Sequence, residues 1–223
     1  MFNAIIFDMD GVLVDSEPIY KYADSLFYKK LGWSATEDDL ASLTGCSGML
    51  IAQRLKKEIP DLELSVETLS KMYDEHIAET LTTCEDLQLT NGVAEWIKKF
   101  SGYGLKLAVG SSSTYDMVQF VLNRFDIAKY FDQIVTSNDV KLTKPHPDIY
   151  IECANKLNEY PENCLVIEDS PNGLKAAKLA GMSCAAYLET NIYPMDTSAF
   201  DMVIEHYNDE EFAKIIARCQ VNQ

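Results

Sequence analysis

The chain has 223 residues, of which 47% are hydrophobic, and this is enough to bury a full core. Its formal charge of −16 and its isoelectric point near 4.5 disfavour nucleic acid and anionic membranes as partners, because both repel an acidic surface. We therefore expect one principal globular domain with a sizeable insert or second domain.

The six cysteines are scattered without a Cys-x-x-Cys pair, and the three histidines, His76, His146 and His206, do not cluster with them. This pattern argues against a zinc site and against disulfides, and it favours a reducing compartment. No long apolar segment is present, and the apolar start is short, has no basic leader and is interrupted by Asp8. We therefore expect a cytoplasmic protein.

Short apolar runs rich in β-forming residues alternate with segments of helical period along most of the chain. The runs lie near residues 3–7, 105–110, 133–136, 164–167, 183–187 and 201–204. Strands that alternate with helices predict an α/β fold, in which helices cover both faces of a parallel sheet. In an open sheet of this kind, ligands bind at the carboxyl ends of the strands.

Residues 16–88 interrupt this alternation, because they show helical periodicity and no convincing strand. The segments 18–31, 47–59 and 65–81 have the pattern of amphipathic helices. This block is too long for a simple connection, so it predicts a helical bundle inserted into the core. The predicted division is a core of residues 1–15 and 89–223 and a helical cap of residues 16–88, which we expect to act as a lid.

The first predicted strand ends in Asp8-Met9-Asp10-Gly11. Side chains alternate along a strand, so Asp8 and Asp10 point the same way, and Gly11 permits a sharp turn. Carboxylates held this close repel each other unless a cation or a proton joins them, which favours a divalent ion such as Mg²⁺. The same spacing also occurs in turns, in surface acid pairs and in the metal sites of other enzymes, so it does not decide the chemistry alone.

Further motifs follow in rigid loops or at strand ends. The run Gly110-Ser111-Ser112-Ser113-Thr114 joins a strand to a helix, where hydroxyl and N–H groups can hold a phosphate or simply cap the helix. Lys144 precedes a proline that restricts its backbone, which holds its ammonium group in one place. Glu168-Asp169 ends another apolar strand, and because Ser170-Pro171 accounts for the next helix start, either acid can complete a metal site.

In this order, the motifs Asp8-x-Asp10-Gly11-x-x-x-Asp15, Ser111, Lys144-Pro145 and Glu168-Asp169 resemble those of the haloacid dehalogenase superfamily. The resemblance covers essentially the whole chain and is to the helical-cap branch, which contains β-phosphoglucomutases and small-metabolite phosphatases. It implies a Rossmann-like parallel sheet, an aspartyl-phosphate mechanism and Mg²⁺ as the cofactor.

The resemblance also implies a role for each matched acid. Asp8 is the nucleophile that attacks phosphorus, and Asp10 is the acid that protonates the leaving oxygen and then activates water. Mg²⁺ is held by Asp8, the backbone carbonyl of Asp10 and Asp169. Glu168 is either a further ligand or lies just outside the ligand set.

For the phosphoryl group, the resemblance implies binding by Ser111 and Ser112, and charge neutralisation by Lys144. The dehalogenases of the superfamily lack the second aspartate, because a leaving halide needs no proton. Asp10 therefore favours phosphoryl transfer over dehalogenation.

The cap is expected to distinguish a phosphatase from a mutase, because a mutase must also hold a second phosphate. In β-phosphoglucomutases the loop that resembles Gly45-Cys46-Ser47 continues with an arginine for that phosphate, whereas Gly48 follows here. The mutases' cap histidine and lysine are replaced at Tyr20 and Tyr73. We therefore predict a phosphatase of a small phosphomonoester, best a sugar phosphate, with a β-phosphoglucomutase as the alternative and Tyr20, Ser47, Gly48 and Tyr73 as candidate cap contacts.

Another alternative is a protein that retains the fold and only binds a phosphorylated ligand or a partner protein. All the reacting groups of the family motifs are present, which favours an enzyme. The expected ligand is a small phosphorylated metabolite. A lid that opens and closes gives no reason to require an oligomer, so the sequence is compatible with a monomer and leaves the oligomeric state open.

Overall fold

The computed structural model describes residues 1–43, 46–190 and 197–220. The chain divides into two compact units, one of Met1–Asp15 with Gln88–Gln223 and one of Ser16–Leu87. We call them the core unit and the helical unit. The function of the helical unit as a lid stays a prediction.

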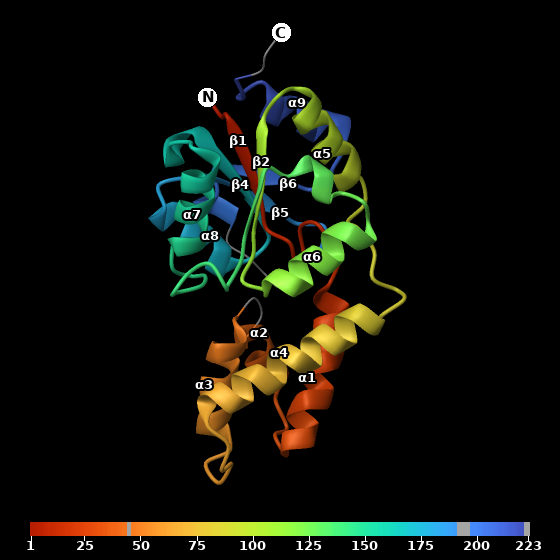
Figure 1. Ribbon diagram of the computed structural model, residues 1–223, viewed down its shortest axis with the longest axis vertical. Coiled ribbons are helices and arrows are strands. Elements are labelled where there is room, and N and C mark those ends of the chain that lie inside the picture. Colours follow the sequence, from red (N-terminus) through yellow and green to blue (C-terminus); the bar gives the residue numbers. More distant parts are fainter. Residues whose placement is uncertain (44–45, 191–196, 221–223) are drawn as a thin grey trace. The chain divides into compact units, whose positions relative to one another are not determined.

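The core unit contains a parallel sheet with the strand order β3-β2-β1-β4-β5-β6 (Figure 1). The central strands are buried on both faces, which explains why they read as continuous apolar runs rather than as alternating ones. The α/β fold predicted from the sequence is thus confirmed. The strands are β1 (Ala4–Phe7), β2 (Lys106–Gly110), β3 (Gln133–Val135), β4 (Cys164–Glu168), β5 (Ser183–Tyr187) and β6 (Met202–Ile204).

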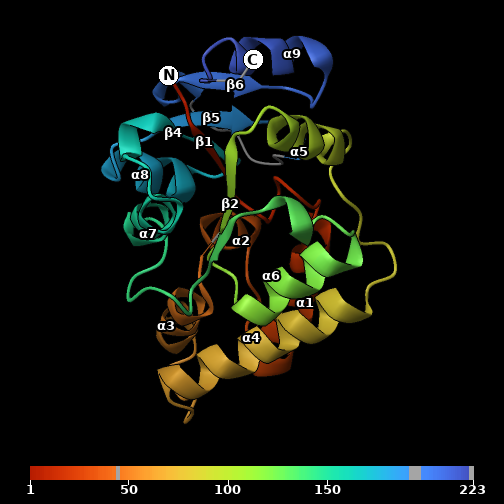
Figure 2. The same cartoon turned by 45° about the horizontal axis from the view of Figure 1, so that its top comes forward.

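Helices cover both faces of this sheet (Figure 2). Ile6 of β1 belongs to the core beneath α7 and α8, which includes Tyr150. The next residue, Phe7, points to the opposite face, where its ring lies 6.3 Å from that of Phe100 on α5, and Phe100 lies 4.8 Å from Phe212 on α9. The helices of this unit are α5 (Val93–Gly102), α6 (Tyr115–Arg124), α7 (Asp148–Leu157), α8 (Pro171–Leu179) and α9 (Asp209–Ile216), with short 3₁₀ turns between some elements.

The register of the sheet places several loops at one edge. Phe7 at the end of β1 pairs with Val109 of β2 and with Ile167 of β4. The residues that follow these three strands therefore leave the same carboxyl edge side by side, which is where an open parallel sheet binds its ligands.

The chain also leaves and re-enters the core unit at neighbouring positions. Val14 forms an antiparallel bridge with Leu89, and the N–H of Asp15 donates to the carbonyl of Gln88 (3.3 Å). Both connections to the helical unit therefore start from one paired segment directly after the Asp8–Gly11 loop.

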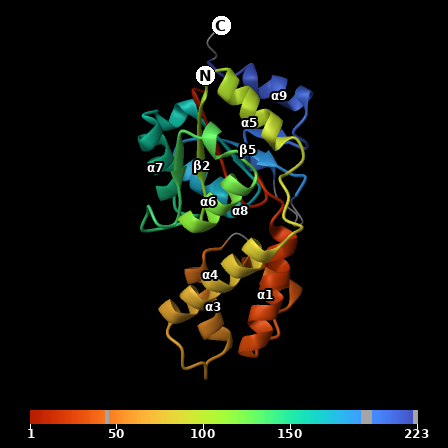
Figure 3. The ribbon, with the colours of Figure 1, turned by 45° about the vertical axis from the view of Figure 1, so that its right-hand side comes forward.

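The helical unit is built around α4, which packs against α1 and α3 (Figure 3). Phe27 of α1 and Tyr73 of α4 meet edge to face with their ring centroids 5.5 Å apart. The sequence pattern predicted three of the helices and missed the short helix α2. The bounds are α1 (Glu17–Leu31), α2 (Glu37–Leu43), α3 (Gly48–Glu58) and α4 (Val66–Thr83). Across the described ranges of both units, every helix is too short or too polar to cross a membrane.

Candidate active site

The loop after β1 brings two acids to the carboxyl edge of the sheet. Asp8 is buried, and its N–H donates to the carbonyl of Ile167 on β4 (3.0 Å). Gly11 has a φ of 75°, and a Cβ atom at this position would lie 1.9 Å from Oδ2 of Asp169. Only glycine permits both this left-handed backbone and this close approach. The loop is therefore held directly against Asp169.

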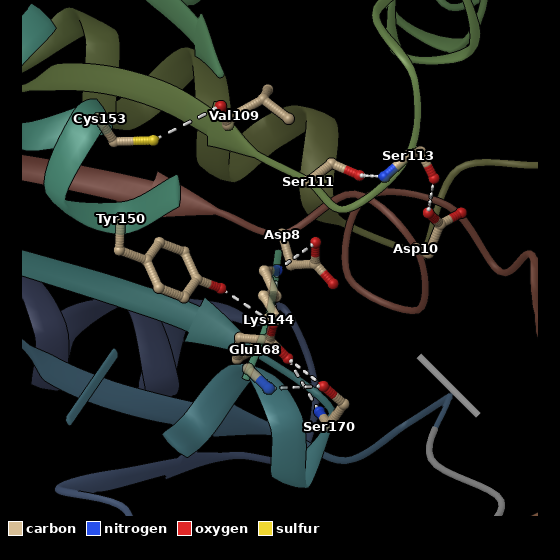
Figure 4. A network of polar contacts seen from close by, with 11 residues as sticks. Asp8, Asp10, Val109, Ser111, Ser113, Lys144, Tyr150, Cys153, Glu168 and Ser170 are labelled. Carbon is tan, nitrogen blue, oxygen red and sulfur yellow. Dashed lines mark hydrogen bonds and ion pairs between the residues drawn. The ribbon is translucent and has the colours of Figure 1, made fainter. Parts of the chain in front are cut away.

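Lys144 joins the loop after β1 to the end of β4. Its Nζ lies 2.7 Å from Oδ1 of Asp8 and 2.6 Å from Oε1 of Glu168, and the side chain is buried (Figure 4). Burial by itself would lower the pKa of Lys144, but the two carboxylates raise it above its ordinary value. Lys144 therefore remains an ammonium group throughout the physiological range.

Glu168 is fully buried and fully hydrogen-bonded. Its Oε1 accepts from Lys144 Nζ (2.6 Å) and from the hydroxyl of Tyr150 (2.9 Å), while its Oε2 accepts from the N–H (2.9 Å) and the hydroxyl (3.0 Å) of Ser170. Burial favours the neutral acid, but the ammonium and these hydrogen bonds hold the pKa of Glu168 below its ordinary value. Glu168 is therefore a charged partner of Lys144.

Asp8, Glu168 and Asp169 together form a cluster that could hold a metal ion. Each offers a carboxylate oxygen, these atoms lie within 4.8 Å of one another, and all three residues are buried. Carboxylate oxygens are the ligands that Mg²⁺ uses in proteins, so the donor set fits such an ion. Among the described residues, the carboxylate of Asp10 is not part of this cluster. Metal binding through the backbone carbonyl of Asp10 stays a prediction.

The electrostatics of Asp8 favour a further positive charge at the site. Burial raises the pKa of Asp8 to about 8 in the metal-free protein, Lys144 opposes this shift, and the charges of Glu168 and Asp10 add to it. One ammonium group thus does not compensate the neighbouring acids. A divalent cation placed beside Asp8 and Asp169 would remove this imbalance and keep Asp8 ionised.

The loop after β2 carries the predicted phosphate-binding hydroxyls. Ser111 is buried, and its Oγ accepts a hydrogen bond from the N–H of Ser113 (3.0 Å). The Oγ of Ser112 is a buried polar atom without a hydrogen-bond partner in the described chain. A buried hydroxyl without a partner is costly, so a ligand oxygen here would satisfy it. The Ser113 hydroxyl donates to Oδ2 of Asp10 (2.8 Å) and so joins this loop to the second acid.

The candidate contacts of the helical unit lie on three of its helices or directly before one of them. Tyr20 is half-buried on α1, Ser47 precedes α3, and Gly48 is the first residue of α3. Tyr73 on α4 is buried, and its hydroxyl donates to Oδ1 of Asp24 (2.9 Å). Their contact with a substrate stays a prediction, and Gly45, which belongs to the same predicted loop, lies outside the described residues.

Sequence reasoning missed Tyr150 and the contact of Ser113 with Asp10. Tyr150 occupies an apolar position of α7 and gives no signal beyond that of a core residue. Ser113 was part of the predicted phosphate loop, but its bond to Asp10 follows from the adjacency of β1 and β2, which the sequence does not state.

The chain matches known proteins over most of its length. A family model described as haloacid dehalogenase-like hydrolase matches residues 5–187. The phosphorylated carbohydrates phosphatase of Thermotoga maritima is 35% identical over 183 residues, which are 81% of this chain and 82% of that protein. Hexitol phosphatase B of Escherichia coli is 32% identical over 196 residues, which are 80% of each chain.

A solved structure supports the same assignment. The crystal structure of CbbY from Rhodobacter sphaeroides in complex with xylulose-(1,5)bisphosphate has a TM-score of 0.80 to this structure at 25% sequence identity. The alignment covers 94% of this chain and 96% of that chain. With the family match, these likenesses establish that the chain belongs to the haloacid dehalogenase-like hydrolases.

Proposed function

We propose that this phosphomonoester hydrolase acts on a small phosphorylated metabolite, and that its preferred substrate is a sugar phosphate. Mg²⁺ is the proposed cofactor, and the reaction passes through a phosphoenzyme formed on Asp8. The observation that carries the proposal is the arrangement at the ends of β1 and β4. The buried carboxylate of Asp8 lies 2.7 Å from the ammonium group of Lys144. One of its oxygens also lies within 4.8 Å of a carboxylate oxygen of Glu168 and of Asp169. This set binds a phosphoryl group, provides a nucleophile and holds a cation.

In the proposed mechanism, a carboxylate oxygen of Asp8 attacks phosphorus, and the bond to the leaving oxygen breaks. Lys144 neutralises negative charge on the phosphoryl oxygens as they crowd against Asp8, and the hydroxyls of Ser111 and Ser112 bind these oxygens. Asp10 donates its proton to the leaving oxygen and afterwards takes one from the water that attacks phosphorus, which breaks the bond to Asp8 and releases phosphate. When bound, Mg²⁺ orients the phosphoryl group and offsets its charge through Asp8 and Asp169.

Hydrolysis is favoured over mutase activity by the surroundings of Gly48. A Cβ atom at Gly48 would lie 2.1 Å from Oδ1 of Asp74, so a residue with a side chain does not fit there unless that carboxylate moves. An acid at this position repels a second phosphate. Arg54, a nearby cation on α3, already forms an ion pair with Asp39 (2.7 Å). These contacts within the helical unit support a substrate with one phosphate.

The substrate class rests on the named relatives. One acts on phosphorylated carbohydrates and another on hexitol phosphates, as their names state. We propose that Tyr20, Ser47, Gly48 and Tyr73 contribute to the choice among such substrates. The compartment we propose is the cytoplasm, in keeping with six cysteines that are all free thiols.

The activity is tested by measuring phosphate release from sugar phosphates, sugar alcohol phosphates, nucleotides and other phosphomonoesters, with Mg²⁺ or with EDTA. Release that depends on the metal and is fastest with sugar or sugar alcohol phosphates is the expected result. Conversion of β-glucose 1-phosphate to glucose 6-phosphate, primed by a bisphosphate and without net phosphate release, would instead identify a mutase.

The role of Asp10 gives a separate prediction. Asp10→Asn should lower kcat about a hundredfold, because the amide can neither protonate the leaving oxygen nor take a proton from the attacking water. The Ser113 hydroxyl can still donate to the amide oxygen, so the loop should keep its structure. Steady-state kinetics with a sugar phosphate and with an activated aryl phosphate check this. The aryl substrate needs less protonation and should lose less, and a variant with full turnover on both would remove Asp10 from the proposed role.

A further inference from the structure

Every acceptor position of the Glu168 carboxylate has a donor. Two donors, Lys144 and Tyr150, bind Oε1, and the N–H and hydroxyl of Ser170 bind Oε2, at distances of 2.6 to 3.0 Å. An ionised carboxylate offers about four lone-pair sites, so a bond to a cation would require the loss of one of these hydrogen bonds. Glu168 has no exposed surface, so water could not take the place of a lost donor.

The surroundings leave Glu168 little room to turn. A Cβ atom at Gly173 in α8 would lie only 1.6 Å from Oε1 of Glu168, so the backbone of that helix lies directly against the carboxylate. Ser170 is itself fixed, because its Oγ also accepts the N–H of Gly173 as the cap of α8 (3.0 Å). The carboxylate is therefore clamped between the start of α8 and Lys144.

Tyr150 contacts both members of the Lys144–Glu168 pair. Its hydroxyl donates to Glu168, and its ring lies 4.8 Å from the ammonium nitrogen of Lys144 (Figure 4). The side chain is completely buried in the core beneath α7, where a phenyl ring would fill almost the same volume. A buried hydroxyl is costly unless it is hydrogen-bonded, and this one is matched to Glu168.

We propose that Tyr150 is a positioning residue whose hydroxyl, together with Ser170, directs the Glu168 carboxylate onto Lys144 and away from the bound cation. Asp8 and Asp169 are then the carboxylates that the cation uses, and Glu168 acts through Lys144 by fixing the ammonium that faces the phosphoryl group. This inference rests on the proposed function and deepens it at the same site.

The first test compares Tyr150→Phe with Tyr187→Phe. Both substitutions delete one buried hydroxyl that donates to a glutamate, since Tyr187 donates to Oε2 of Glu189 (2.7 Å). Tyr150→Phe should lower kcat/KM about five- to tenfold, with most of the loss in kcat, because the displaced ammonium acts on charge that develops in the transition state. Tyr187→Phe should stay within about twofold of the wild type. Equal losses in both variants, or none in Tyr150→Phe, would overturn the inference.

The second test does not depend on activity. Glu168→Gln and Asp169→Asn each remove one negative charge from the cluster with little change in shape, so a difference between them reports direct ligation. Titration of the folded variants with Mg²⁺ by calorimetry should show affinity lowered at least about fivefold more by Asp169→Asn than by Glu168→Gln. Equal weakening would make Glu168 a ligand and refute the inference, whether or not Tyr150→Phe folds.

The two tests also separate this inference from the function on which it rests. If the wild-type protein releases no phosphate from any substrate, the proposed function fails, while the Mg²⁺ titrations still decide between Glu168 as a ligand and Glu168 as the partner of Lys144. If the wild type is active and Tyr150→Phe is equally active, only the role of Tyr150 is lost. Thermal unfolding of each variant provides the control for folding.

Discussion

Asp8→Asn is expected to reduce metal-dependent phosphate release at least about ten-thousandfold, which is the scale seen when an enzyme loses its nucleophile. An amide oxygen is too weak a nucleophile to attack phosphorus, and it carries no charge for a cation. Asparagine has the same shape, and its amide oxygen can still accept from Lys144, which donates to Asp8 at 2.7 Å in the native protein. The variant should therefore fold and lose its chemistry. Phosphate release with Mg²⁺ and with EDTA measures the effect.

Asp126→Asn provides a matched control for this change. Asp126 is an exposed acid of the core unit with a φ of 54°, a left-handed backbone that asparagine also tolerates. Asp126 forms an ion pair with Lys129 on the surface, where solvent screens both charges, so its loss should leave kcat within about twofold of the wild type. Turnover retained by Asp8→Asn would mean that a different group attacks phosphorus.

Strand ends were the part of the site that the sequence predicted best. Apolar runs that end in Asp8 and in Glu168 place both acids at the carboxyl edge of a parallel sheet, whatever the lengths of the intervening helices. The contact between these acids through Lys144 follows from the pairing of β1 with β4. Motif order could suggest that pairing, but only the three-dimensional structure gives the distances.

Tyr150 could not be predicted in the same way. Helical periodicity marks it as a core position, and a core tyrosine and a core phenylalanine follow the same pattern. The partner of its hydroxyl is set by how α7 lies against the end of β4, which depends on tertiary packing. Residues that act through others thus leave weaker sequence signals than residues that touch the substrate.

Helix α2 was missed for a different reason, because seven residues are too few to establish a helical period. A local signal was nevertheless present. The N–H of Asp39 donates to the hydroxyl of Thr36 (3.2 Å), and the N–H of Thr36 donates to the carboxylate of Asp39 (3.0 Å). This reciprocal pair is similar to a capping box, with aspartate in place of glutamate. A search for caps would have found the start of α2 where periodicity did not.

Lys144→Met should reduce both activity and stability, because the ammonium serves both. Without it, phosphate release should fall about a thousandfold, since no other described cation contacts Asp8 or Glu168. The free energy of unfolding should fall by about 3–5 kcal/mol at neutral pH, because the buried carboxylate of Glu168 loses its charge partner. Phosphate release and urea unfolding measure the two effects. Lys129→Met removes an exposed ion pair with Asp126 that solvent screens, and it should leave both phosphate release and the free energy of unfolding close to those of the wild type.

The pH dependence of this loss has a definite sign. In the wild type, Lys144 and the hydrogen bonds hold the pKa of Glu168 below its ordinary value, so their stabilisation is present at neutral pH and is lost as the pH falls. In the variant, burial without an ammonium raises the pKa of Glu168 and raises that of Asp8 further than in the wild type, so the stability that these two groups contribute is present in acid and is lost as the pH rises. The difference in stability between the two proteins should therefore shrink as the pH falls toward about 4. A difference that is constant from neutral to acidic pH would mean that the loss comes from packing of the lysine stem, and that the charge pair at the centre of this site contributes little to the fold.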